Sequence, residues 1–229
     1  MEGLSLIIPA RNTGSFIGES IEQYNLVFSK RFKNFEIIVV FNDNWDSGAE
    51  KCRELAKKFP LKVIEIPQRG KGYALIRGFE EARFDFIGFM DADNPFSFDS
   101  ILKMIDSLDF YDGVIASKYL KGRAKNQDFL IRRITSLGGG FISRILFNLK
   151  FTDTQAGAKF FRKGVWDKID KNFICRGFDF DIEFLYKAQR ANFKIKEFYT
   201  PCKFKKFSTF RLKYLPGILK RLFKLRFLK

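Results

Sequence analysis

Histidine is absent from this chain of 229 residues, and cysteine is scarce. Without an imidazole, the chain can form neither a Ser-His-Asp triad nor a His-ligated metal site. The three cysteines, Cys52, Cys175 and Cys202, lie far apart and are odd in number. This pattern argues against a disulfide framework or a cysteine zinc site, and it favours a reducing, cytosolic compartment.

The sequence also lacks a run of about 20 apolar residues, the length that a membrane-spanning helix needs. At the N-terminus, Glu2 precedes a short apolar stretch, without the basic start and long apolar segment of a signal peptide. We therefore expect a cytoplasmic protein. With 46% hydrophobic and 30% charged residues, the chain can bury a core, which excludes a disordered or fibrous protein.

Acidic residues are outnumbered, at 26 against 42 Lys and Arg, and the formal net charge is +16. Residues 198–229 contain ten Lys or Arg and no acid. Such an excess favours a polyanionic partner, which can be a nucleic acid, an anionic lipid or a phosphorylated substrate.

The last 20 residues have the pattern of an amphipathic helix. One face collects Leu215, Ile218, Leu219, Leu222 and Phe223, and the opposite face carries Lys220, Arg221 and Lys224. We expect a domain over residues 1–208, followed by a basic membrane-interface tail over residues 209–229. That tail would hold the protein on the cytoplasmic face of an anionic membrane surface. The alternative is ordinary packing of this helix against the domain.

Short apolar stretches alternate with helical periods along the first half of the chain. Strands are expected at residues 4–9, 35–41, 61–66, 84–90 and 113–117, with helices between them, the first of them capped by Ser15. This order predicts an α/β fold with a mostly parallel sheet flanked by helices. Later helices are expected at 129–150, 178–190 and from 216, and strands at 157–162, 193–199 and 201–207.

Polar clusters follow three of these strands, at residues 9–13, 42–46 and 91–94. Because ligands bind beyond the carboxyl ends of parallel strands, these clusters should converge on one crevice. In Asp91-Ala92-Asp93, the alternation of an extended chain places both carboxylates on one side. Carboxylates plus phosphate oxygens suit Mg²⁺ or Mn²⁺, although the motif alone fits a solvated turn equally well.

A glycine-rich basic turn, Arg69-Gly70-Lys71-Gly72, precedes the helix that leads into the same strand. Its glycines allow close approach of the backbone, and its cations can meet a phosphate. The spacing matches neither a Walker loop nor a dinucleotide-binding fingerprint. Trp45 and Trp166 are expected to be packing residues.

Taken in order, these motifs resemble a family 2 glycosyltransferase with the GT-A (Rossmann-like) fold, of the polyprenyl-phosphate (dolichyl-phosphate) hexose synthase branch. The likeness covers about residues 4–208. Besides the stretches above, it includes residues 7–12, 36–40, 116–119, 153–157 and 177–183, and Arg132-Arg133. The chain differs from the family pattern at Thr13-Gly14, where an acid is usual, and at Lys118, where Arg is usual.

The resemblance implies a role for each matching residue. The nucleotide would be bound at Pro9, Ala10, Asn12 and Asp43, with Lys71 near the donor. Asp91 and Asp93, with Ala92 between them, would hold a divalent ion on the diphosphate. The acceptor phosphate would be gripped by Lys118, Arg132, Arg133 and Ser136. Gln155 and Asp179 would border the sugar or acceptor pocket, and Lys206 and Ser208 would belong to a loop that closes over the diphosphate. The residues expected to be catalytic are Asp91, Asp93, Arg132 and Asp179.

The implied reaction is a metal-dependent, inverting transfer of a hexose from a nucleotide sugar to a polyprenyl or dolichyl phosphate. A UDP-glucose-like donor is preferred over GDP-mannose, the donor of dolichyl-phosphate mannose synthases. A soluble family 2 transferase with a sugar acceptor is an alternative. A basic nucleic-acid-binding protein is a remote one, because the strands read as buried and leave no aromatic face for RNA. No nucleic acid is therefore expected as a partner.

Overall fold

The computed structural model describes residues 3–93, 96–118, 120, 144–201 and 214–227. The chain forms two compact units. The first unit comprises residues 1–94 and 157–167, and the second comprises residues 95–156 and 168–229.

A five-stranded sheet forms the centre of the first unit. Its strands are β1 (Leu4–Ala10), β2 (Phe35–Asn42), β3 (Leu61–Ile66), β4 (Phe86–Met90) and β6 (Ala158–Arg162). They lie in the order β3-β2-β1-β4-β6, and the first four are parallel. The last strand, β6, pairs antiparallel with β4. The central strands are buried on both faces, which explains why they read as continuous apolar runs.

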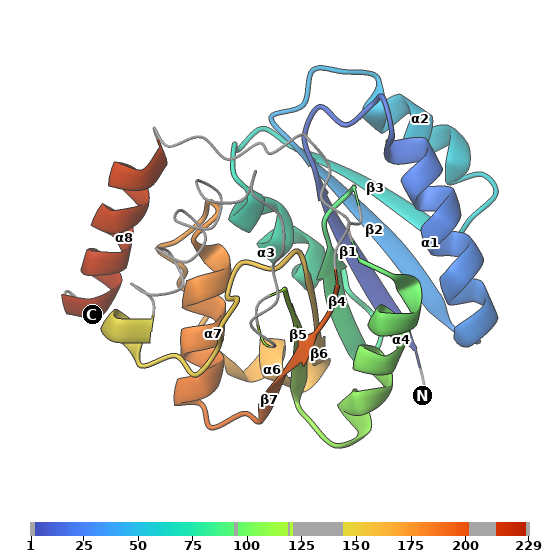
Figure 1. Ribbon diagram of the computed structural model, residues 1–229. Helices are drawn as coiled ribbons and strands as arrows, with labels where there is room; N and C mark the ends of the chain where they lie inside the picture. The colour runs from blue at the N-terminus through green and yellow to red at the C-terminus, as the bar shows by residue number, and fades with distance from the viewer. Residues whose placement is uncertain (1–2, 94–95, 119, 121–143, 202–213, 228–229) are drawn as a thin grey trace. The chain divides into compact units, whose positions relative to one another are not determined.

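Helices cover both faces of this sheet. The pair α1 (Ile17–Arg31) and α2 (Gly48–Leu55) lies on one face, and α3 (Lys71–Glu81) lies on the other (Figure 1). A short helix, α6 (Lys163–Lys168), follows β6 directly, and the sequence did not predict it. Its Trp166 is buried against Phe79 of α3, so this tryptophan is the packing residue that the sequence suggested.

The second unit is built around two parallel strands, β5 (Gly113–Ser117) and β7 (Ile195–Tyr199). The helix α4 (Phe98–Asp106) packs against β5 and continues into the short 3₁₀ helix η1 (Ser107–Asp109). Two longer helices, α7 (Phe180–Arg190) and α8 (Leu215–Phe227), lie side by side (Figure 1). None of the described helices is both long and apolar enough to cross a membrane.

Most of the predicted elements are confirmed, with corrections at their ends. The helix α1 is preceded by Phe16, without a side-chain cap, and Ser15 is exposed, so the predicted Ser15 cap is wrong. The helix predicted for residues 129–150 has ended by Asn148, whose φ of 51° breaks a right-handed helix. Residues 202–207 of the last predicted strand lie outside the described residues. Cys52 and Cys175 are buried free thiols.

The helical face predicted for the C-terminus is also corrected. Ile218, Leu222 and Leu225 are buried, whereas Leu215 and Phe223 are exposed. Arg221, placed by the sequence on the solvated face, pairs instead with a buried carboxylate of α7. The apolar residues of α8 therefore divide between a packed side and an exposed side.

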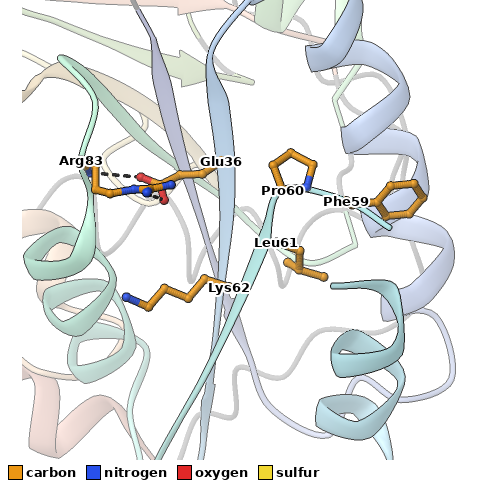
Figure 2. Close-up of a pocket in the computed structure, with 6 residues that line it drawn as sticks. All are labelled: Glu36, Phe59, Pro60, Leu61, Lys62 and Arg83. Atoms are coloured by element: carbon orange, nitrogen blue, oxygen red, sulfur yellow. Dashed lines mark hydrogen bonds and ion pairs between the residues drawn. The ribbon is translucent and has the colours of Figure 1, made fainter. Parts of the chain in front are cut away.

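A hollow of about 300 Å³ opens near the amino ends of β2 and β3 (Figure 2). The buried Glu36 carboxylate beside it accepts hydrogen bonds from Ser5 Oγ at 2.7 Å and from Arg83 Nε at 3.0 Å. Its charge is thus already compensated. Because the polar clusters follow the carboxyl ends of the strands, this hollow lies at the opposite edge of the sheet.

Candidate functional site

The side chain of Asn42 connects the carboxyl ends of β1 and β2 to the glycine-rich turn before α3. With its amide oriented to satisfy both neighbours, Asn42 donates to the Ala10 carbonyl oxygen and accepts from the Gly70 backbone N–H, both at 2.9 Å. Gly70 has φ 149° and ψ 137°, a conformation that glycine adopts without steric cost. Asn42 therefore fixes the turn that carries Lys71 against the edge of the sheet.

Two turns at this edge are tied together by side chains. The Asn12 backbone N–H donates to Asn44 Oδ1 at 2.7 Å, and the Trp45 N–H donates to Asn12 Oδ1 at 3.1 Å. Asp46 accepts from the Gly14 N–H at 2.6 Å. Asn12 and Asp43 have positive φ values, 52° and 49°. Such conformations are held only where the surroundings fix them, and they concentrate at binding sites.

Two arginines converge on Asp43. Arg11 donates to its Oδ2 from Nη2 at 2.8 Å and from Nε at 3.2 Å, and Arg69 Nε lies 3.9 Å from the same oxygen. Three strand-end turns thus meet at one carboxylate, because Arg11 follows β1, Asp43 follows β2 and Arg69 precedes α3. The predicted convergence of residues 9–13 and 42–46 is confirmed.

Asp91, the first residue after β4, has three close neighbours. Lys71 Nζ lies 2.9 Å from its Oδ1, and Tyr24 Oη donates to its carbonyl oxygen at 2.8 Å. Its backbone N–H donates to the Gly157 carbonyl oxygen at 2.8 Å. A Cβ at Gly157 would lie 1.9 Å from Asp91 Oδ2, so glycine is needed if this carboxylate is to keep its position.

Tyr24 is completely buried beside the Asp91-Ala92-Asp93 turn. Burial raises the pKa of the Tyr24 hydroxyl well above its usual value of 10.0, and the negative charges of Asp91 and Asp93 raise it further. Ala92 and Asp93 form a turn and not an extended chain, so the placement of both carboxylates on one side stays a prediction.

This turn fits a hard divalent ion. Its donors are carboxylate oxygens, which Mg²⁺ and Mn²⁺ prefer. In the part of the chain that the structure describes, no three His, Cys, Asp or Glu side chains form a metal-binding group. The protein would then supply Asp91 and Asp93, and the remaining ligands would come from substrate phosphate and water, the usual arrangement for Mg²⁺.

A second lysine near Lys71 was not predicted as a site residue. Lys159, buried on β6, lies opposite Phe89 in the antiparallel pairing with β4. Its Nζ is 5.1 Å from the centre of the Phe89 ring, and Lys71 Nζ is 4.9 Å from the same centre. Only the pairing of β6 with β4, which the sequence did not reveal, brings Lys159 to this place.

The first unit thus gathers eight of the predicted donor-side residues at one edge of its sheet, whereas Lys206 and Ser208 lie outside the described residues. The eight are Pro9, Ala10, Asn12, Asp43, Lys71, Asp91, Ala92 and Asp93. Asn42, Tyr24, Arg11 and Gly157 support them and were not predicted as site residues. Asn42 and Gly157 lie in motifs that the sequence analysis identified. Tyr24 could be predicted only to lie in a helix, and nothing in the sequence indicated its role in the site.

In the second unit, the backbone of Lys118 contacts a loop of residues 152–155, which includes Gln155. The buried carboxylate of Glu197 holds this loop. Glu197 of β7 accepts from the backbone N–H groups of Thr152 and Asp153, at 2.9 and 2.8 Å. The Lys118 N–H donates to Asp153 Oδ2 at 3.3 Å. Gln155 Nε2 donates to the Phe178 carbonyl oxygen at 3.3 Å. The loop is therefore anchored on both sides by hydrogen bonds.

Asp179 lies at the start of α7 and is completely buried. Its carboxylate receives two hydrogen bonds from Arg221 of α8, from Nε at 2.6 Å and from Nη2 at 3.2 Å. The hydrogen bond to Asp179 raises the pKa of Arg221. Burial raises the pKa of the nearby Cys175 thiol, and the charges of Asp179 and Glu183 add to this effect. Cys175 therefore stays protonated and is not a nucleophile.

Five predicted residues, Arg132, Arg133, Ser136, Lys206 and Ser208, lie outside the described residues.

The prediction that Trp45 is a packing residue is wrong. Its side chain is 72% exposed, and the guanidinium of Arg11 lies 4.6 Å from the centre of its ring. It projects from the turn after β2 and does not pack in the core.

Comparison with known proteins gives consistent results. Residues 5–170 match the model of glycosyl transferase family 2. Dolichol-phosphate mannosyltransferase of Pyrococcus furiosus is 33% identical over 191 residues, which are 81% of this chain and 53% of the relative. Dolichyl-phosphate beta-glucosyltransferase of Saccharomyces cerevisiae is 29% identical over 218 residues, which are 85% of this chain and 65% of the relative. The chain thus spans between half and two thirds of the length of these relatives.

Among solved structures, glucosyl-3-phosphoglycerate synthase from Mycobacterium tuberculosis shares the fold, with a TM-score of 0.68 at 15% identity. The match covers 97% of this chain and 76% of that one. That crystal contains Mn²⁺, uridine diphosphate and phosphoglyceric acid. The likeness confirms the predicted glycosyltransferase fold.

Proposed function

Because the chain belongs to glycosyl transferase family 2, we propose that it transfers a hexose from a nucleotide sugar to a polyprenyl phosphate of the dolichyl type. The names of two relatives support the acceptor, since both act on dolichol derivatives. One observation supports the nucleotide-sugar donor. Lys71 and the Asp91-Ala92-Asp93 turn meet at the carboxyl edge of a parallel sheet, where α/β proteins bind nucleotides.

The chemistry follows from the charges at this edge. The leaving group is a nucleoside diphosphate, on which negative charge develops. A Mg²⁺ or Mn²⁺ ion held by Asp91 and Asp93 would neutralise part of that charge. Lys71 and Lys159 add fixed positive charge at no reorganisation cost during the reaction. Arg11 and Arg69 hold Asp43 at the end where the nucleoside would lie.

The acceptor makes a strong general base unnecessary. A phosphate monoester, with a second pKa near ~6, is already an anion at neutral pH. Its oxygen can attack the anomeric carbon directly, which agrees with a chain that contains no histidine. Inversion at that carbon follows from the resemblance. In the second unit, Lys118 and Gln155 are the described residues that we assign to the acceptor side.

We assign the donor as UDP-glucose-like, with GDP-mannose as the competing choice. The test is a radiolabel assay with each donor, a short polyprenyl phosphate and Mg²⁺ or Mn²⁺. We expect transfer to the lipid from UDP-glucose and no product when EDTA is present. Product from GDP-mannose alone would reverse the donor assignment. No lipid product from either donor would refute the proposed acceptor and favour a soluble sugar acceptor.

We also propose that α8 binds the anionic cytoplasmic face of a membrane. Leu215, Phe223 and Phe227 remain exposed on this helix, at 36%, 49% and 64%. Lys220 and Lys224 lie exposed among them, and no acid occurs in residues 198–229. Apolar side chains interspersed with cations are typical of interfacial helices, and each cation adds about 1 kcal/mol near an anionic surface.

Vesicle flotation tests this membrane contact. The double variant Phe223→Ser and Phe227→Ser should lose binding to phosphatidylserine vesicles with little loss of stability, because both side chains are exposed. Phe110→Ser is the matched control, since Phe110 is 80% exposed elsewhere in the second unit. Unchanged flotation of the double variant would refute this contact.

A further inference from the structure

Trp45 is an exposed indole on a rigid turn. Exposing a tryptophan forgoes the large gain from burying its ring, so its exposure calls for an explanation. The turn that carries it is not loose, because Asn12, Asn44 and Asp46 tie it to the turn after β1. The indole is therefore held at a defined place on the carboxyl edge of the sheet.

Arg11 fixes the orientation of this indole. Its guanidinium lies 4.6 Å from the ring centre, within the range of a cation–π contact, and Asp43 anchors the same guanidinium through two hydrogen bonds. An aromatic ring that is fixed before a ligand arrives loses little conformational entropy on binding. With 72% of the residue exposed, most of the ring surface remains available for a planar ligand.

The position of the ring suits one end of a nucleotide. Trp45 follows β2 and Asp91 follows β4, and both strands flank β1. Adjacent strands lie about 4.8 Å apart, so β2 and β4 run about 10 Å apart on either side of β1, and β2 extends farther along β1 than β4 does. A nucleoside diphosphate can reach across this distance, with its phosphates near Asp91 and Lys71 and its base near Trp45.

We propose that Trp45, backed by Arg11, is the platform on which the base of the donor nucleotide stacks. This inference rests on the proposed nucleotide-sugar donor and adds a residue that fixes the donor's position. A membrane surface would also accept an exposed tryptophan. It is the weaker choice here, because the turn that carries Trp45 is tied by hydrogen bonds to the turn after β1, at the carboxyl ends of the strands where α/β proteins bind nucleotides.

Fluorescence provides a test that does not depend on catalysis. The chain contains two tryptophans, so the variant Trp166→Phe leaves Trp45 as the single indole. With excitation at 295 nm and Mg²⁺ present, UDP or GDP should quench its emission in a saturable manner. Phosphatidylserine vesicles should leave the emission unshifted. A blue shift with vesicles and no response to nucleotides would overturn the inference in favour of a membrane contact.

Calorimetry with three variants measures the contribution of stacking. Stacking a base on an aromatic side chain is worth about 1–3 kcal/mol by alanine substitution, so Trp45→Ala should weaken UDP or GDP binding about tenfold or more. Trp45→Phe should retain most of the affinity. Phe110→Ala, which removes another exposed ring, should have no effect. Inorganic pyrophosphate, which has no base, should bind Trp45→Ala and the unaltered protein equally.

The outcomes separate this inference from the proposed function. Nucleotide binding that is equally tight in Trp45→Ala, without quenching of Trp45, would overturn the platform and leave the transferase proposal intact. Equal weakening of pyrophosphate and nucleotide in Trp45→Ala would also overturn it, because that result indicates general damage to the site. Failure of the unaltered protein to bind UDP or GDP at all would refute the nucleotide-sugar donor and the platform together.

Discussion

Gly157 is the residue at which an added side chain would displace the Asp91 carboxylate. In Gly157→Ala, the new Cβ would collide with Asp91 Oδ2, the end of a short side chain that can swing away. We expect a stability loss of only about 1–2 kcal/mol. Metal-dependent nucleotide affinity should fall by about tenfold or more, because small displacements of a binding group have large effects.

The matched control for this change is Gly164→Ala, since no atom lies within 4 Å of the Cβ that it would add. Urea unfolding and titration with UDP and Mn²⁺ measure the two quantities. If Gly157→Ala kept normal nucleotide affinity, the carboxylate of Asp91 would have no role in binding the nucleotide.

Tyr24 stabilises the Asp91-Ala92-Asp93 turn through its hydrogen bond to the Asp91 carbonyl oxygen. Tyr24→Phe should lower the free energy of unfolding by about 1 kcal/mol near neutral pH, as expected for one buried hydrogen bond. Chemical unfolding of both proteins over a range of pH is the measurement.

The pH dependence of this effect has a definite sign. Below pH 10.0 the hydroxyl is protonated in the folded and the unfolded state, so its contribution is constant. Above pH 10.0 the unfolded chain loses this proton while folded Tyr24, with its raised pKa, keeps it. Stability therefore falls as the pH rises, and Tyr24→Phe should show a shallower alkaline decline. Parallel declines in the two proteins would contradict the raised pKa.

At this scale, the sequence predicted Asp91, Asp93 and Lys71 as site residues and missed the residues that hold them in place. Asp91, Asp93 and Lys71 stand in short motifs whose chemistry can be read directly. Tyr24 and Asp91 are 67 positions apart, and only the packing of α1 brings them together. Trp45 was wrongly predicted to be a packing residue because tryptophan side chains are usually buried, and composition does not show which of the two tryptophans is exposed.

At the scale of elements, an ion pair between Arg221 and the buried Asp179 helps to hold the C-terminal helix. Removing one partner of a buried pair costs about 3–5 kcal/mol, and the cost should be lower here because Arg221 is partly exposed. Arg221→Ala should therefore destabilise the protein by about 2 kcal/mol. Lys220→Ala, an exposed cation on the same helix, should change stability by less than about 0.5 kcal/mol. Equal effects of the two substitutions in urea unfolding would contradict a structural role for the pair.

The periodicity of α8 predicted a helix correctly and its orientation incorrectly. An amphipathic pattern identifies an apolar stripe, but it treats every arginine as solvated. Arg221 has a buried partner 42 residues earlier in the chain, and on this helix Ile218 and Leu225 are buried while Phe223 is exposed. The strands of the first unit were easier to predict, because a strand buried on both faces leaves an unbroken apolar run.

At the scale of the whole molecule, the formal net charge of +16 should act on anionic partners in a salt-dependent way. Raising the salt concentration from 0.05 M to 0.5 M should release most of the protein from phosphatidylserine vesicles, because charges separated by more than about 4 Å are then screened. Flotation at several salt concentrations measures this. Binding that is independent of salt would indicate purely apolar insertion and would contradict the electrostatic part of the proposal.

The fold class was predictable because the order of strands and helices in the first 117 residues leaves few topologies. The antiparallel insertion of β6 was not predictable. Its five residues give no signal of direction, and it joins β4 from about 70 positions away. Lys159 and Gly157, which complete the donor side, come with this strand, so the sequence could not place them.

The account rests on two carboxylates that hold a cation on a nucleoside diphosphate, and calorimetric titration with UDP and with GDP in the presence of Mn²⁺ tests it most directly. We predict metal-dependent binding of at least one nucleotide, lost in Asp91→Asn and in Asp93→Asn. It should be retained in Asp99→Asn, which alters an exposed acid of α4. Binding that is equally tight in EDTA, or that both substitutions at the turn leave unchanged, would contradict the account.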